Sequence, residues 1–61
     1  MNYILWRYKG KTKEYYAGGD IKHTVMGTTP FSQHATTLIK DEIVEYSAAI
    51  HDAGWNKKVK V

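Results

Sequence analysis

A single glycine between two aromatic and basic stretches is the feature that most limits how this chain can fold. Residues 3–16 read YILWRYKGKTKEYY, and apolar and polar residues alternate on both sides of Gly10. A two-residue turn at Gly10-Lys11 places glycine at the first turn position, as a type II′ β-turn prefers. The sequence therefore predicts an antiparallel β-hairpin over residues 3–17.

The position of this turn fixes the register of the hairpin. It predicts that the following residues lie opposite one another: Lys9 and Thr12, Tyr8 and Lys13, Arg7 and Glu14, Trp6 and Tyr15, and Leu5 and Tyr16. The register contains one ion pair and one aromatic pair, and both kinds of cross-strand contact stabilise a hairpin. A turn at Lys9-Gly10 would instead set Trp6 against Lys13, so we prefer the first register.

Alternation along the two strands divides the hairpin into two faces. One face carries Ile4, Trp6, Tyr15 and Ala17, with Tyr8 and Lys13 nearer the tip. The other face carries Leu5, Arg7, Lys9, Thr12, Glu14 and Tyr16. Because the first face is the more apolar, we expect it to pack inward against the rest of the domain.

Apolar residues at helical spacing predict a helix over residues 40–53. The stripe consists of Ile39, Ile43, Tyr46, Ile50 and Ala53. Spacings of three and four place these residues on one side of a helix. Thr37 is the best N-cap candidate. Gly54 suits the C′ position of a Schellman cap, and Trp55 follows where that cap places a hydrophobic contact.

The remaining segments complete a predicted α+β fold. The stretch 21–25 (IKHTV) could form a third strand, 26–30 (MGTTP) has turn chemistry, and 33–38 (QHATTL) is a strand or an extended approach to the helix. In the final stretch, 56–61 (NKKVKV), the valines are expected to face the core and Lys58 and Lys60 the water. The sequence predicts one domain over 1–61, with an antiparallel sheet of three or four strands packed on one helix in two layers.

Composition narrows the functional classes. The chain has no cysteine, a formal net charge of +3, and neither a signal-peptide pattern nor a long apolar run, so we expect a cytoplasmic protein. A chain of 61 residues buries only about 60% of the surface that its unfolded form exposes, so a homodimer is possible.

Catalytic and metal-binding patterns are weak. His23, His34 and His51 do not have the spacing of a paired zinc site. Ser32, near His34 and Asp20, lacks a nucleophile-elbow context. We therefore expect no enzyme activity, no cofactor and no metal.

The basic and aromatic side chains are the candidate binding residues. They are Arg7, Tyr8, Lys9, Lys11, Lys13, Tyr16, Lys57, Lys58 and Lys60. If the first and last strands lie side by side, the lysines could follow the phosphates of a nucleic acid, and a tyrosine could stack on bases. The same residue types are also enriched at protein-binding hot spots, and an exposed strand edge can bind a partner by strand addition.

The order of these motifs resembles that of small ββαβ domains encoded in phages and prophages of Gram-positive bacteria. The resemblance lies in the hairpin YILWRYKGKTKEYYAGG, the pair ATTL, the acidic helix KDEIVEYSAAI and the short basic strand at the end. It implies a mobile-element origin. Many members of that group have no assigned activity, so it transfers no functional residues. On this basis we expect a non-enzymatic module that binds a host or phage protein, with nucleic-acid binding as the alternative.

Overall fold

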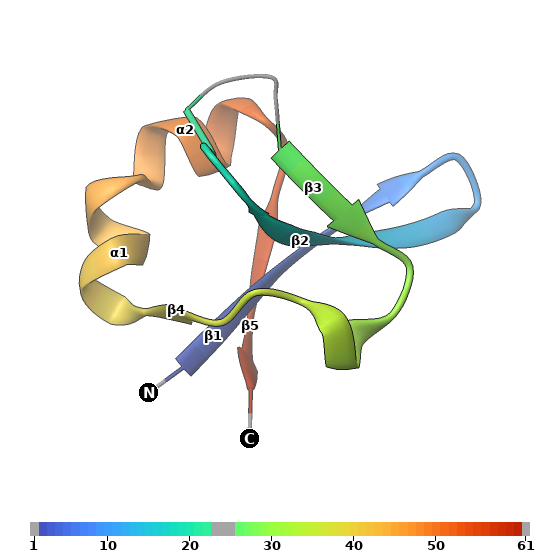
Figure 1. Ribbon diagram of the computed structural model, residues 1–61. Coiled ribbons are helices and arrows are strands. Elements are labelled where there is room, and N and C mark those ends of the chain that lie inside the picture. Colours follow the sequence, from blue (N-terminus) through green and yellow to red (C-terminus); the bar gives the residue numbers. More distant parts are fainter. Residues whose placement is uncertain (1, 23–25, 61) are drawn as a thin grey trace.

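The fold is an antiparallel sheet with two short α-helices beside it (Figure 1). The computed structural model describes residues 2–22 and 26–60. Its elements are, in order, β1 (Asn2–Lys9), β2 (Thr12–Gly19), β3 (Met26–Thr29), the 3₁₀ helix η1 (Ser32–His34), β4 (Leu38–Ile39), α1 (Lys40–Glu45), α2 (Ser47–Asp52) and β5 (Asn56–Lys60). The α+β class predicted from the sequence is confirmed.

The predicted hairpin is confirmed, with four of the five expected cross-strand pairs; the fifth, Leu5 with Tyr16, is not among the paired residues. Strands β1 and β2 pair Trp6 with Tyr15, and the three following pairs toward the turn are those expected. Gly10 has a φ of 63°, whereas Lys11 does not have positive φ. Positive φ at the first turn position alone is the pattern of a type II′ turn, which explains the glycine there.

Strand β1 is the centre of the sheet. Along one edge it pairs with β5, over Asn2 to Trp6. Asn2 and Tyr3 pair with β4 as well, so β4 occupies the opposite edge, where β2 has already left β1. Thr36, just before β4, donates its N–H to the carbonyl of Tyr16 (2.8 Å). The chain before the helices thus enters the gap between β1 and β2, which gives the sheet its curled shape (Figure 1).

Strand β3 corrects the reading of residues 26–30 as a turn. Met26–Thr29 forms an edge strand that pairs with β2, with Tyr15 opposite Thr29 and a shift in register before Gly19. Gly27 is explained by close backbone approach, because a Cβ there would lie 3.0 Å from the Ala17 carbonyl oxygen. Most of the strand expected at 21–25 lies outside the described residues, and Ile21 is a buried turn residue.

The predicted single helix is two short helices separated at Tyr46, whose φ and ψ are −101° and 16°. Thr37 does not cap it: Ile39 is the N-cap, and its N–H donates to Glu42 Oε1 (3.1 Å). The predicted C-terminus is confirmed. Trp55 N–H donates to the Ile50 carbonyl and Gly54 N–H to the His51 carbonyl, both at 3.0 Å, as in a Schellman motif.

The main core joins the sheet, the loops and both helices. Its buried residues are Leu5, Tyr16, Ile21, Leu38, Ile43, Ile50 and Trp55. The expectation that the Trp6 face of the hairpin packs inward is therefore wrong for Trp6 and Tyr15, because Leu5 and Tyr16 of the other face belong to the main core. Of the Trp6 face, Ile4 is buried, as expected. The Leu5 face can point inward because two of its three charged residues, Arg7 and Glu14, pair with each other (2.8 Å), while the third, Lys9, is exposed near the turn.

Two apolar residues expected in the core are exposed. Ile39 is 50% exposed, because it precedes α1 as a strand residue instead of lying on the helical stripe. Val59 is 42% exposed, because β5 is an edge strand with all five residues at the surface; Val61 lies outside the described residues. Neither α1 nor α2, the α-helices of the described ranges, has the length and apolar character required to cross a membrane.

Candidate functional site

The sheet face turned away from the main core gathers aromatic and basic side chains, and we refer to it as the outer face. Residues directly opposite one another on paired strands share a face. In this way Tyr15 lies beside Trp6, and Lys58 and Lys60 lie beside Ile4 and Asn2. The large apolar, aromatic and basic residues of the outer face are Ile4, Trp6, Tyr8, Lys13, Tyr15, Lys58 and Lys60.

Trp6, Tyr8 and Lys13 form a contact cluster on the outer face. The rings of Trp6 and Tyr8 meet edge to face, with centroids 5.6 Å apart. The Lys13 ammonium lies 4.5 Å from the Trp6 ring centroid and 5.9 Å from that of Tyr8, so it interacts with both π-systems. Trp6 is half-buried, whereas Tyr8 is 63% exposed. Tyr8 is therefore the ring that a ligand can reach most easily.

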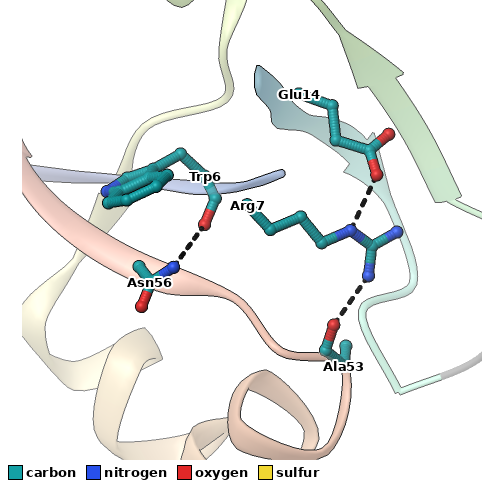
Figure 2. A network of polar contacts seen from close by, with 5 residues as sticks. All are labelled: Trp6, Arg7, Glu14, Ala53 and Asn56. Carbon is teal, nitrogen blue, oxygen red and sulfur yellow. Dashed lines mark hydrogen bonds and ion pairs between the residues drawn. The ribbon is translucent and has the colours of Figure 1, made fainter. Parts of the chain in front are cut away.

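Figure 2 shows that Trp6 and Arg7 project to opposite sides of β1. Arg7 Nε donates to Glu14 Oε2 and its Nη1 to the Ala53 carbonyl, both at 2.8 Å. On the Trp6 side, the Asn56 amide donates to the Trp6 carbonyl (3.4 Å) and ties β5 to β1. Because side chains alternate along β1, Arg7 takes part in a structural network on one side of the sheet and Trp6 lies on the other.

A shallow pocket lies farther along the outer face. Its volume is about 300 Å³ and its lining residues are Ile4, Ser32, Gln33, Lys58, Val59 and Lys60. The pocket brings η1 next to β5, although the two elements are far apart in the sequence. It therefore combines an apolar residue, Ile4, with two polar side chains from η1 and two ammonium groups from β5.

The structure divides the candidate binding residues between the two sides of the sheet. Tyr8, Lys13, Lys58 and Lys60 lie on the outer face, and the first and last strands are side by side, as the nucleic-acid hypothesis requires. The rest lie elsewhere: Lys11 is in the turn, and Arg7, Lys9, Tyr16 and Lys57 belong to the opposite face.

Two of those residues are engaged in the fold. Tyr16 is 6% exposed, and its hydroxyl donates to the Gly19 carbonyl. Burial raises the pKa of Tyr16. Arg7 is held by its two acceptors, and its hydrogen bond to Glu14 lowers the pKa of that carboxyl group. Neither side chain is free to receive a ligand without disturbing the core.

The sequence did not identify four residues of the candidate site: Trp6 and Tyr15 of the outer face, which were expected in the core, and Ser32 and Gln33 of the pocket. The predicted Arg7–Glu14 pair could have indicated that Trp6 and Tyr15 face outward. An ion pair whose charges neutralise each other can face inward, and Trp6 and Tyr15 lie on the face opposite that pair. No local signal could have revealed that η1 packs next to β5.

The residues considered for metal binding or nucleophilic catalysis do not form a site within the described residues. In the described parts of the chain, no three histidine or carboxylate side chains gather as metal ligands, and His23 lies outside those parts. Ser32 and His34 are both in η1, whereas Asp20 accepts the Lys22 N–H (3.0 Å) in a turn. This contact gives Asp20 the turn role that its sequence context predicts.

Comparisons of the chain with protein families, with curated proteins and with solved structures find no match. The resemblance to phage-encoded domains therefore stays a prediction.

Proposed function

We propose that this protein binds single-stranded nucleic acid along the outer face of its sheet. The observation that supports the proposal best is the cluster of Trp6, Tyr8 and Lys13, together with Lys58 and Lys60 on the same face. Single-strand binding proteins combine a cationic surface that follows the backbone with aromatic rings that stack on bases.

Tyr8 is the stacking residue in this proposal. Its exposed ring can accept a base that is not already stacked in a duplex, and Trp6 supports it from the side through the edge-to-face contact. Lys13 holds its ammonium beside both rings, where it can pair with the phosphate next to the stacked base. Lys58 and Lys60 extend the positive charge along β5.

Binding of a host or phage protein is the second candidate. Strand β5 pairs with β1 and has all five residues exposed, so its other edge could accept a strand from a partner. The three lysines of β5 argue against this candidate, since lysine on an edge strand deters such pairing. We therefore place it after nucleic-acid binding.

The test compares two triple variants with the same change of charge. Lys13, Lys58 and Lys60 are replaced by glutamine in the first, and Lys9, Lys11 and Lys57 in the control. Each variant loses three of nine basic residues against six acidic ones, so its formal net charge falls from +3 to 0. Because Lys57 lies 5.9 Å from the Tyr3 ring centroid, each triple also removes a lysine that lies over an aromatic ring.

Binding of a labelled single-stranded oligonucleotide is measured by fluorescence anisotropy at two salt concentrations. Three phosphate contacts predict a slope of log K against log salt of about −2, and hence about 20-fold weaker binding after a fourfold rise in salt. The outer-face triple should lose most of this slope and the control triple little. Equal loss in the two variants, or no binding by the wild-type protein at low salt, would overturn the proposal.

A further inference from the structure

We propose that the shallow pocket between η1 and β5 holds one base of the bound strand, and that Gln33 reads the edge of that base. This inference rests on the proposed function and adds specificity to it. Stacking on Tyr8 tolerates any base, because every base has a π-face. A base preference therefore needs a second place on the outer face where hydrogen-bonding groups meet a base edge.

The pocket has the composition that a base requires. Its apolar lining comes from Ile4, which is 4% exposed, and from Val59, which is 42% exposed. Ser32 and Gln33 supply polar groups from η1. Lys58 and Lys60 line the same pocket and can pair with the phosphates on either side of the base. Apolar contact together with a few placed polar groups is the usual make-up of a small-molecule site.

The Gln33 side chain is available for recognition. Its amide presents a donor and an acceptor next to each other, an arrangement that can pair with a base edge in bidentate fashion. Within residues 2–22 and 26–60, neither the Gln33 amide nor the Ser32 hydroxyl forms a hydrogen bond with the protein. Binding a base to these two side chains would therefore break no hydrogen bond within the described chain.

Local contacts hold η1 in place. His34 N–H donates to the Phe31 carbonyl and Ala35 N–H to the Ser32 carbonyl, both at 3.1 Å. The rings of Phe31 and His34 meet with centroids 5.7 Å apart, and Phe31 N–H donates to Thr29 Oγ1 (3.2 Å). The backbone that carries Gln33 is thus held by hydrogen bonds on both sides, so binding a ligand would have to order only its side chain.

The pocket lies along β1 from the cluster of Trp6, Tyr8 and Lys13. Ile4, Trp6 and Tyr8 are alternate residues of β1, so they lie on one face at intervals of about 7 Å. A strand that runs along β1 would therefore stack at Tyr8 and reach the pocket at Ile4. Lys58, opposite Ile4, lies beside this path.

The experiment measures dissociation constants for A, C and T homo-oligonucleotides of one length. We expect the wild-type protein to bind the best of the three at least about fivefold more tightly than the worst, which is the lower end of the discrimination given by a bidentate contact. Gln33→Ala should bring all three within about twofold while keeping the wild-type dependence of binding on salt. Thr37→Ala, an exposed polar residue outside the pocket, is the matched control and should keep the wild-type ratios.

The two proposals fail differently. If the wild-type protein binds all three oligonucleotides equally, or if Gln33→Ala keeps the wild-type ratios, the pocket does not read bases, although the proposed function can still stand on the result of the two lysine triple variants. If no oligonucleotide binds at low salt, both proposals are wrong.

Discussion

The guanidinium carbon of Arg7 lies 4.1 Å from the ring centroid of Trp55. This contact joins the hairpin to the residue that follows the Gly54 cap of α2. The same guanidinium donates to Glu14 on the neighbouring strand and to the carbonyl of Ala53 at the end of α2 (Figure 2). A cation is favourable there because the carbonyl end of a helix is electronegative. Arg7 thus links three parts of the fold.

Replacing Arg7 should destabilise the protein. We expect Arg7→Ala to lower the free energy of unfolding by about 2–3 kcal/mol, since it removes charge-assisted hydrogen bonds and leaves partly buried acceptors unpaired. Lys9→Ala, two residues along the same face and exposed, should change it by less than about 0.5 kcal/mol. Urea unfolding followed by circular dichroism measures both. Equal effects would contradict the structural role of Arg7.

Glu14 should make stability depend on pH. The hydrogen bond from Arg7 lowers the pKa of Glu14 below its ordinary value of 4.5, so the folded state favours the carboxylate more strongly than the unfolded chain does. Its contribution to stability is present above that ordinary value and is lost as the pH falls through the lower pKa of the folded state.

Unfolding of the wild-type protein and of Glu14→Gln, measured at about pH 6 and about pH 3, tests this linkage. The variant should be the less stable protein at the higher pH, and the gap should narrow at the lower pH. Glu45→Gln, at an exposed position of α1, removes the same charge without touching the pair. A gap that stays constant with pH would show that Glu14 does not act through its ionisation.

Local signals explain which parts of the fold the sequence predicts. The turn at Gly10 and the cap at Gly54 each depend on a few neighbouring residues, and both are confirmed. The orientation of the hairpin depends on a partner 46 residues away, because Arg7 turns inward toward the Ala53 carbonyl. Comparing the number of apolar residues on the two faces takes no account of this distant acceptor. The comparison therefore predicted the wrong inward face.

The candidate site was also predictable only where it depends on local sequence. Alternation along the strands identifies Tyr8 and Lys13 as neighbours, and the basic final strand identifies Lys58 as a candidate. Gln33 could not be found, because its place in the pocket depends on how η1 packs beside β5. The misread turn at Gly27 is similar: its glycine meets a distant backbone carbonyl instead of making a bend.

Two isoleucines of the predicted stripe should respond differently to one substitution. Ile43 is 8% exposed and belongs to the core, whereas half of Ile39 is exposed. Ile43→Val should lower the free energy of unfolding by about 0.5–1.5 kcal/mol, because it deletes a buried methylene group, and Ile39→Val should change it little. Thermal and urea unfolding give the comparison. A larger loss at Ile39 would show that the stripe faces the core along its whole length.

At position 54, the stability of the end of α2 should depend on the left-handed backbone conformation and not on the space around the residue. Gly54 has a φ of 76°, and a Cβ at this position would meet no atom within 4 Å. Gly54→Ala should therefore cost about 1–2 kcal/mol through the left-handed conformation itself. Gly54→Asn should cost less, since asparagine adopts this conformation more readily. Urea unfolding of the three proteins tests the order glycine, asparagine, alanine. If alanine and asparagine were both neutral, the chain would have to end α2 without the Schellman hydrogen bonds to Ile50 and His51.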